Sequence, residues 1–243
     1  MNKASFLAHS LTNLHKRRVE SAHRLCSEWL EKCKNPSVAF SAGKDSTVLL
    51  HLVRTIFSDC QAHFSHPEYI LNETQELLDA TPNLNQYAYK NMHADFFTAW
   101  VDHSELPDNV EWFNGKSSAQ WAREAGIDGI AVGIRAEENS YRKIAIRKYG
   151  SLFFVQKKQI WQCWAIHDWS VEDIWAYIFS KDVSYNRAYD RMDNAGVPLK
   201  AQRIGPFANR KALKMGQLAI LRTVFPEQYQ RFVAQFPEAS NYT

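Results

Sequence analysis

The segment Val38-Ala39-Phe40-Ser41-Ala42-Gly43-Lys44-Asp45-Ser46 constrains the fold of this chain more than any other. It predicts a buried strand, a tight glycine loop and then an apolar helix over residues 47–53. That order places backbone N–H groups and a helix N-terminus where a phosphate chain can bind. Only two loop residues precede the glycine-lysine pair, which is too few for a Walker A motif.

The polar side chains of this loop fit a phosphate chain bound with Mg²⁺. Lys44 supplies a positive charge, and Asp45 supplies a carboxylate oxygen of the kind that ligates Mg²⁺. Ser41 and Ser46 add hydroxyl groups. We therefore expect the backbone of residues 41–46 to bind phosphates, with Asp45 at the metal ion.

Charge is distributed unevenly along the 243 residues, although the net charge is only +3. Residues 59–138 contain fourteen acidic and four basic residues, a net charge of 4 − 14 = −10. By contrast, residues 139–167 and 194–226 each contain six lysines and arginines and no acidic residue. This asymmetry predicts a basic surface that binds a polyanion, and interleaved aromatic residues such as Tyr149 and Trp161 suit stacking on exposed nucleotides.

The cysteines argue against a metal cluster held by this chain. There are four, none in a CxxC pair, so neither an Fe–S cluster nor a structural zinc is expected. Cys163 lies between tryptophans and is expected to be buried and inert, although a role as a sulfur carrier stays open. The N-terminus is polar and no apolar run is long enough to span a bilayer, so we expect a cytoplasmic protein without a membrane partner.

The order of strand and helix patterns predicts an α/β fold. The expected helices cover residues 11–33, 73–80, 95–102, 118–125 and 171–179, and the expected strands residues 61–64, 86–89, 129–134 and a hairpin of 151–155 with 160–165. Such alternation predicts an open, twisted, mostly parallel sheet with helices on both faces. We expect an N-terminal helix over residues 1–34, a nucleotide-binding domain over 35–184 and a small helical C-terminal region over 185–243.

Two further segments contain residues that suggest a binding site or a recognisable helix start. Gly133-Ile134-Arg135 follows a predicted strand end, where ligands bind in open α/β sheets, and Arg142 comes seven residues after Arg135. An arginine there can neutralise phosphate charge. The second segment runs from Asp168-Trp169-Ser170 to Tyr189-Asp190. We expect three of its aromatic residues to pack in the core, namely Trp169, Trp175 and Tyr177. We also expect Ser170 to cap a helix together with Asp173.

Together these three blocks, in this order, resemble the phosphoadenosine-phosphosulfate (PAPS) reductase-like branch of the PP-loop ATP pyrophosphatases over residues 35–190. The loop is similar to that superfamily's Ser-Gly-Gly-Lys-Asp-Ser, with Ala42 at the first glycine. Because alanine disfavours positive φ, we expect Ala42 to have a negative φ.

The resemblance implies a fold of the adenine nucleotide α-hydrolase type and an enzyme that cleaves ATP between its α- and β-phosphates. The backbone from Ser41 to Ser46 would bind the β- and γ-phosphates. Lys44 and a Mg²⁺ ion near Asp45 would offset the charge of the leaving pyrophosphate. Arg135 or Arg142 would contact the α-phosphate or the acceptor. Gly133 would also lie at the nucleotide.

The chain departs from true PAPS reductases, which use a cysteine near the C-terminus, because it has none after Cys163. The ATP pyrophosphatases of DNA phosphorothioation systems (Ssp and Dnd types) fit its charge pattern better. That resemblance implies adenylation of a DNA phosphate before sulfur transfer, with a cysteine desulfurase or another sulfur donor as partner.

Three alternatives stay open beside this one. Leu50-His51 is similar to the small subunit of sulfate adenylyltransferase, which works with a GTPase. The others are a sulfonucleotide reductase-like enzyme and a nucleotide-binding module without turnover. The sequence leaves the acceptor, the sulfur donor and the oligomeric state open.

Overall fold

The structure is a computed structural model, and it describes residues 2–67, 69–88, 118–205, 207 and 216–242. The helix expected over residues 95–102 lies outside this described part, so that expectation stays a prediction. Within the described residues, no helix is both long enough and apolar enough to cross a membrane.

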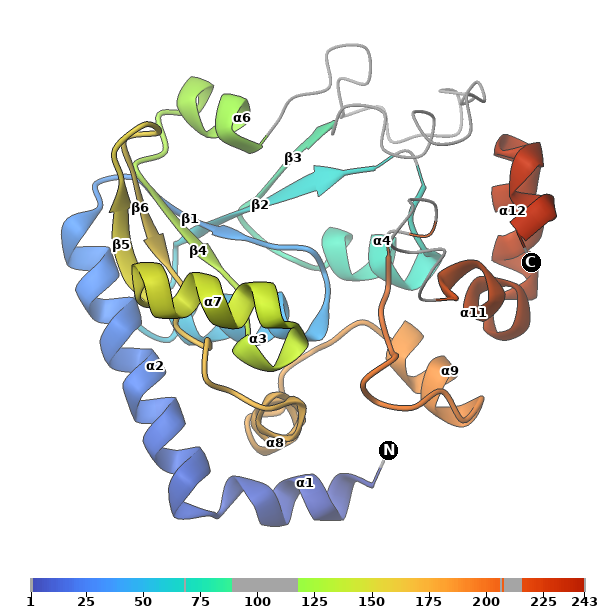
Figure 1. Cartoon of the computed structure of the whole chain (residues 1–243), viewed down its shortest axis with the longest axis horizontal. Coiled ribbons are helices and arrows are strands. Elements are labelled where there is room, and N and C mark those ends of the chain that lie inside the picture. Colours follow the sequence, from blue (N-terminus) through green and yellow to red (C-terminus); the bar gives the residue numbers. More distant parts are fainter. Residues whose placement is uncertain (1, 68, 89–117, 206, 208–215, 243) are drawn as a thin grey trace.

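Six strands in the described residues form one sheet in the order β3-β2-β1-β4-β6-β5 (Figure 1). Their bounds are β1 Pro36–Ala39, β2 Gln61–His66, β3 Leu84–Ala88, β4 Gly129–Val132, β5 Leu152–Val155 and β6 Ile160–Cys163. Neighbouring strands are parallel except β5 and β6, which form the expected antiparallel hairpin. The predicted open, mostly parallel sheet is therefore confirmed.

Helices follow or precede each central strand. They are α1 Lys3–Ser10, α2 Asn13–Lys32, α3 Lys44–Arg54, α4 Asn72–Asp79, α6 Ser118–Glu124, α7 Ser140–Tyr149, α8 Val171–Ser180, α9 Ala188–Asn194, α11 Gln217–Val224 and α12 Pro226–Gln235, with short 3₁₀ helices η2 Ala136–Glu138 and η3 Pro237–Tyr242. The sequence analysis did not predict α7, whose residues are mostly polar and exposed.

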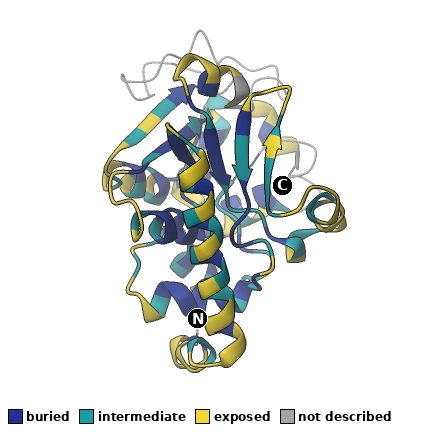
Figure 2. Cartoon of the chain, turned by 90° about the vertical axis from the view of Figure 1, so that its left-hand side faces the viewer, coloured by how far each residue is buried: buried dark blue, intermediate teal, exposed yellow. Residues whose placement is uncertain are grey.

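The apolar side chains form two clusters, one on each face of the sheet. The larger cluster includes the buried side chains of α2 and α3, and the smaller one includes Trp121 of α6 and Ile130 of β4. Ile130 and its neighbour Ala131 belong to different clusters because successive strand residues point to opposite faces. Figure 2 views the long helix α2 from outside, with its exposed outer side in front of buried strands.

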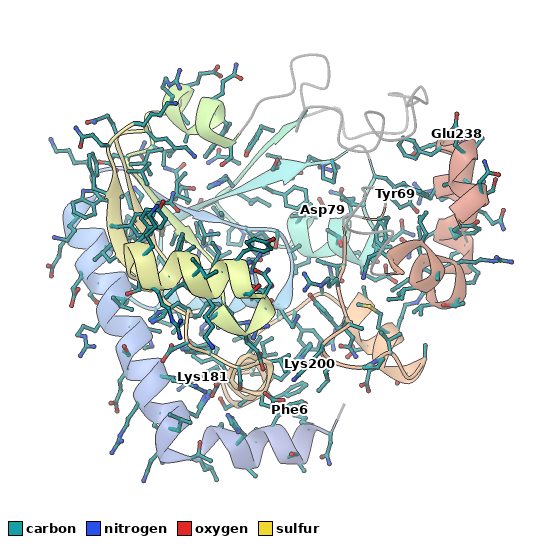
Figure 3. The ribbon with its side chains drawn as sticks, in the orientation of Figure 1. Phe6, Tyr69, Asp79, Lys181, Lys200 and Glu238 are labelled. Atoms are coloured by element: carbon teal, nitrogen blue, oxygen red, sulfur yellow. The ribbon has the colours of Figure 1, made fainter. Side chains whose placement is uncertain are left out.

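The N-terminal segment differs from its prediction. The helix expected over residues 11–33 is present as α2, but a further helix, α1, precedes it. The chain turns at Leu11 and Thr12, and the Thr12 side chain accepts a hydrogen bond from the His15 backbone N–H at 3.3 Å to begin α2. Phe6 of α1 points toward α8 and lies 6.4 Å, between ring centroids, from Trp175 (Figure 3). This contact between distant segments gave no local signal in the sequence.

The aromatic residues expected in the core are buried there. Trp169, Trp175 and Tyr177 are at most 1% exposed. Ser170 and Asp173 form the predicted capping box at the start of α8, with the Ser170 Oγ accepting from the Asp173 backbone N–H at 3.2 Å.

Candidate nucleotide-binding site

The loop after β1 and the segment after β4 lie side by side. Ala39 at the end of β1 pairs in register with Val132 at the end of β4. The direction of the strand order reverses at these two strands, and open α/β sheets bind ligands at such a switch point. A cavity of about 710 Å³ opens there, large enough for a nucleotide.

The loop is held by its own hydroxyl groups. Ser46 Oγ donates a hydrogen bond to the Gly43 carbonyl at 2.9 Å and accepts one from the Ser41 backbone N–H at 3.1 Å. The N-cap residue of α3 is Gly43, which has no side chain to cap the helix, and Tyr189 Oη accepts from the Lys44 N–H at 3.2 Å. The N-terminus of this 11-residue helix, with its partial positive charge, therefore faces the cavity.

Ala42 corrects one prediction. Its φ is 54°, in the left-handed region, whereas we expected a negative φ. The tight turn between β1 and α3 imposes this conformation in spite of the steric cost to a side chain. Ala42 is fully buried and is not among the residues that line the cavity, so the structure places it behind the cavity wall.

Lys44, Asp45 and Arg135 form a charged group at the cavity wall. Arg135 Nε donates to Asp45 Oδ1 at 2.5 Å, and Lys44 Nζ lies 3.5 Å from Asp45 Oδ2. Arg135 is 4% exposed, and its Nη1 also donates to Glu137 Oε2 at 2.6 Å. The structure thus places the predicted Arg135 between two carboxylates, where it links the two loops.

Glu137 extends this network to α8. Its Oε2 also accepts a hydrogen bond from the Val171 backbone N–H at 2.8 Å, and the Trp169 carbonyl accepts from Arg135 Nη1 at 3.3 Å. The sequence analysis did not assign Glu137 a role. The three sequence blocks therefore meet in space through Arg135 and Glu137.

Gly133 has a packing role at this site. A Cβ atom there would lie 3.1 Å from the backbone carbonyl carbon of Asp45 and from the backbone nitrogen of Ser46, which is tighter than side chains normally allow. Glycine thus lets the end of β4 approach the first turn of α3. Gly133 lines the cavity as predicted, and this close approach is the reason that it is a glycine.

Several lining residues come from the C-terminal region, which the sequence analysis did not include in the site. Lys200 and Arg203 line the cavity with Lys44, Arg135 and Arg142. Burial and then the charge of Arg203 lower the pKa of Arg142 from its usual value, against the opposing charge of Asp45. The acid-free run over residues 194–226 was the signal that could have identified Lys200 and Arg203.

Unpaired polar atoms also line the cavity. Buried side-chain atoms of four lining residues have no hydrogen-bond partner among the described residues, namely Ser65 Oγ, Gln202 Oε1, Arg203 Nε and both amide atoms of Gln217. Buried polar groups without partners are rare in proteins. Because these atoms are themselves buried, they would reach a ligand only if the cavity wall rearranged.

Asp45 fits Mg²⁺ as a single carboxylate ligand. Arg135 engages its Oδ1, whereas the one partner of Oδ2 among the described residues is the Lys44 ammonium group at 3.5 Å. Mg²⁺ commonly takes one or two carboxylates and obtains its other ligands from phosphates and water. Asp45 together with a bound phosphate chain would meet that requirement.

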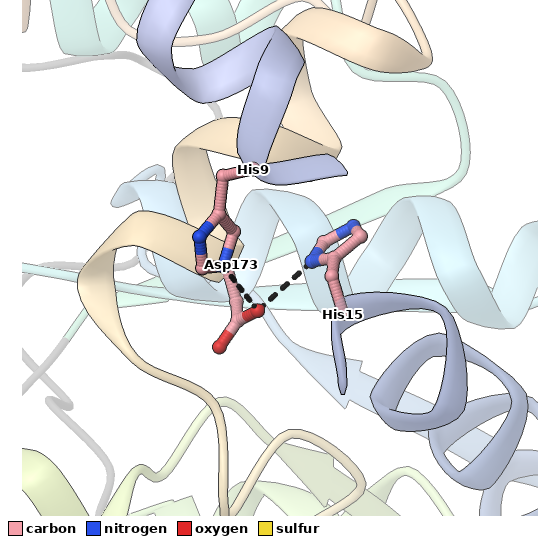
Figure 4. A group of neighbouring side chains, drawn as sticks. All are labelled: His9, His15 and Asp173. Carbon is pink, nitrogen blue, oxygen red and sulfur yellow. Dashed lines mark hydrogen bonds and ion pairs between the residues drawn. The ribbon is translucent and has the colours of Figure 1, made fainter. Parts of the chain in front are cut away.

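Among the described residues, one group of three side chains has ligand atoms close enough to share a metal ion, and it lies elsewhere. It consists of His9, His15 and Asp173 (Figure 4). His9 Nε2 and His15 Nδ1 each lie 2.9 Å from Asp173 Oδ1. Asp173 Oδ2 accepts from the Arg18 guanidinium and, at 2.9 Å, from the Ser170 backbone N–H.

This cluster fits a structural contact better than a metal site. The carboxylate is fully buried, both of its oxygens have partners, and Arg18 already balances its charge. Burial alone would raise the pKa of Asp173, but the hydrogen bonds from His15, Ser170 and His9 and the charge of Arg18 together lower it. The cluster therefore fastens α1 and α2 to the start of α8.

The cysteines are remote from the cavity. None of the four lines it, and Cys26, Cys60 and Cys163 are fully buried. Burial raises the pKa of Cys33 to about 12 and that of Cys60 to about 11, while a hydrogen bond with Cys26 and burial raise that of Cys163. These thiols therefore stay protonated at neutral pH and are poor nucleophiles.

Known proteins resemble this chain at low identity. It is 25% identical over 233 residues to the uncharacterized protein YbdN of Escherichia coli, and 25% identical over 240 residues to the uncharacterized protein MJ0973 of Methanocaldococcus jannaschii. The alignments cover 76% and 90% of this chain but only 57% and 54% of those proteins, so the chain spans about half their length.

Enzymes of sulfonucleotide reduction are also related. The adenosine 5'-phosphosulfate reductase of Staphylococcus epidermidis is 23% identical over 171 residues, which cover 68% of this chain and 70% of that enzyme. The phosphoadenylyl-sulfate reductase of Candida auris superposes with a TM-score of 0.54 over 79% of this chain and 91% of that one, at 16% identity, and so shares the fold. Residues 35–212 match the phosphoadenosine phosphosulfate reductase domain, and the chain belongs to this family.

Proposed function

We propose that this protein cleaves ATP between the α- and β-phosphates and adenylates an acceptor for sulfur transfer, with a DNA phosphate as the acceptor. One observation supports this proposal most strongly. The cavity at the loop is lined by cationic side chains and by the N-terminus of α3, whereas none of the four cysteines lines it. The site thus suits phosphate chemistry better than chemistry on a protein thiol.

The proposed step needs no protein nucleophile. An oxygen of the acceptor attacks the α-phosphorus, the bond from that phosphorus to the bridging oxygen breaks, and its electron pair leaves with pyrophosphate. Lys44 and the N–H groups at the start of α3 would stabilise the leaving charge, and Mg²⁺ bound at Asp45 would add further positive charge. A sulfur nucleophile from a partner, such as a cysteine desulfurase, then displaces AMP from the activated acceptor.

Arg142 and Arg203 would bind the α-phosphate. Both line the cavity, and burial and then the charge of Arg203 lower the pKa of Arg142. An anion bound between them would relieve this repulsion, as guanidinium groups bind phosphate oxygens in pairs. Arg135 would act through Asp45, because its buried guanidinium already has two carboxylate partners.

The test is to identify the products of α-labelled ATP with Mg²⁺, with and without DNA. We expect label in AMP or in an adenylated acceptor, at a rate lowered about 10²- to 10³-fold in Lys44→Ala. Lys181→Ala, which removes an exposed lysine at the end of α8, is the matched control and should leave the rate unchanged. Formation of ADP would contradict the proposal. ATP binding without turnover, even with DNA and a desulfurase present, would favour a non-catalytic module.

Reduction of a sulfonucleotide is the second candidate, and the related reductase of Staphylococcus epidermidis favours it. That chemistry needs a reactive thiol, but none of the four cysteines lines the cavity, and burial raises the pKa of Cys60 while a hydrogen bond with Cys26 and burial raise that of Cys163. We therefore expect no sulfite from adenosine 5'-phosphosulfate or its 3'-phosphorylated form with a thiol donor. Sulfite formation that survives Cys163→Ser would favour reduction by a thiol outside this chain.

A further inference from the structure

Helix α7 differs from the other α-helices in the described residues because none of its ten residues is buried. Each of the others has at least one buried side chain, such as Phe6 in α1 or Trp121 in α6. Burial of an apolar face is what normally holds a helix in place. Since α7 contributes no buried side chain to the core, its sequence has to be explained by something other than folding.

The side chains of α7 combine positive charge with exposed apolar groups. Its four charged residues are all basic, and Lys143, Arg147 and Lys148 are exposed and have no ion pair among the described residues. Tyr141 is 84% exposed and Ile144 is 60% exposed. Because these two residues are three apart, they lie on one side of the helix. A large exposed tyrosine and isoleucine among unpaired cations are typical of an interaction surface.

The first turn of α7 lies at the edge of the nucleotide cavity. Asn139 caps the helix by accepting from the Arg142 backbone N–H at 2.9 Å, and Arg142 is ion-paired with Glu138, both of which line the cavity. The rest of the helix extends away along the front of the molecule in Figure 1. Beyond Arg142, whose charge is paired with Glu138, three exposed basic residues follow along the helix, namely Lys143, Arg147 and Lys148.

We propose that α7 binds the sugar-phosphate backbone of a DNA strand and holds one of its phosphates at the mouth of the nucleotide cavity. This inference rests on the proposed function, because it names the surface that would present the acceptor. The helix is about 15 Å long, which corresponds to about four nucleotide steps of a DNA strand. Each exposed basic side chain of α7 can neutralise one phosphate along that length.

Two features favour a nucleic acid over an acidic protein as the occupant. Tyr141, near the cavity end of α7, offers an exposed aromatic ring on which an unpaired base can stack, whereas the ring of Tyr149 at the other end already stacks on Phe153. In addition, the cations of α7 continue into a cavity that already has the character of a phosphate site, with Arg142, Lys200 and Arg203 in its wall. A strand on α7 could therefore place a phosphate in the cavity without leaving the basic surface.

The test compares two triple variants with the same change in net charge. The first variant reverses the charge of three exposed basic residues of α7 (Lys143→Glu, Arg147→Glu, Lys148→Glu). The control variant reverses the charge of three exposed basic residues of α2 (Lys16→Glu, Arg17→Glu, Arg24→Glu). Binding of a fluorescent single-stranded DNA 20-mer is measured by anisotropy over a series of salt concentrations. ATP cleavage without DNA is measured in parallel, and no residue changed lines the cavity.

We expect the α7 variant to bind DNA at least tenfold more weakly than the α2 variant. The slope of log K against log salt concentration should be shallower by about 2 in the α7 variant, since about three phosphate contacts are lost and each contributes about 0.7 for a single strand. Tyr141→Ala should weaken binding further through loss of stacking. Equal weakening in the two triple variants, or competition by poly-glutamate as effective as by DNA, would overturn the inference.

The two proposals fail separately in this experiment. If the wild-type protein cleaves ATP but the α7 variant binds DNA normally, the docking surface is wrong and the proposed reaction stands. If α7 governs DNA binding but ATP is not cleaved with or without DNA, the docking surface stands and the proposed reaction is wrong. DNA stimulation of ATP cleavage that disappears in the α7 variant alone would support both.

Discussion

Asp45 and Asp173 occupy similar local positions but have different surroundings. Each lies in the first turn of a helix, α3 or α8, and each is paired with an arginine. The Asp173 side chain is 0% exposed, and its two oxygens accept hydrogen bonds from His9, His15, Arg18 and Ser170. The Asp45 side chain is 18% exposed and lines the cavity, with one oxygen engaged by Arg135.

The difference in burial and in hydrogen-bond partners distinguishes a structural carboxylate, Asp173, from a carboxylate that a ligand or metal ion could reach, Asp45. Asp173 connects three helices and has no accessible oxygen for a ligand. Asp45 keeps Oδ2 directed at Lys44 and the cavity, so it could bind a cation without loss of its partner Arg135. Local sequence does not distinguish these roles, since both residues satisfy the preference for acids in the first turn of a helix.

The largest expected effect is on stability, and it separates the two aspartates. Asp173→Ala should lower the free energy of unfolding by about 3–5 kcal/mol, because it leaves Arg18 and the two histidines without their buried partner. Asp45→Ala should lower it by about 1–2 kcal/mol, because Arg135 keeps Glu137. Urea unfolding measures both variants, and equal losses would show that Asp45 is structural too.

The next effect concerns His63, which is buried like Asp173 but lines the cavity like Asp45. Burial lowers the pKa of His63 to about 4. Between pH 6.5 and 4 the unfolded chain therefore binds a proton that the folded protein does not, and stability should fall by about 3 kcal/mol as the pH falls through that range.

The control for this titration is His63→Gln, which removes the ionisable group. Its stability should depend less on pH than that of the wild type between pH 6.5 and 4, as measured by urea unfolding at a series of pH values. The variant also loses the 2.8 Å hydrogen bond between His63 Nδ1 and Ser37 Oγ and the stacking of His63 on Trp121, so only the pH dependence is compared. Identical pH dependence in both proteins would show that folding does not lower the pKa of His63.

The smallest effect tests strain in the loop that holds Asp45. Ala42→Gly removes the cost of a side chain at a φ of 54° but also removes a buried methyl group. These effects oppose each other, so the free energy of unfolding should change by less than about 1 kcal/mol, and ATP binding measured by calorimetry should persist. If the protein cleaved ATP only after this substitution, Ala42 would be the residue that prevents catalysis in the natural loop.

Much of the fold could be predicted because its signals are local. The strand, loop and helix at residues 38–53, the hairpin and the capping box at Ser170 all follow from short-range spacing and residue type, and all are present. Helix α1 was missed because its contact through Phe6 with Trp175 joins segments more than 160 residues apart. The left-handed φ of Ala42 was missed because the turn, and not the residue type, determined it.

The sequence by itself determined the family and the position of the glycine loop between β1 and α3, because these depend on residue types at fixed short spacings. Only the tertiary structure decided the rest of the site. It placed Arg135 between Asp45 and Glu137, brought Lys200 and Arg203 to the cavity from beyond α9, and left α7 exposed beside it. These arrangements depend on segments that are distant in the sequence but meet at one edge of the sheet. The spacing of neighbouring residues therefore cannot predict which distant charged side chains will lie together.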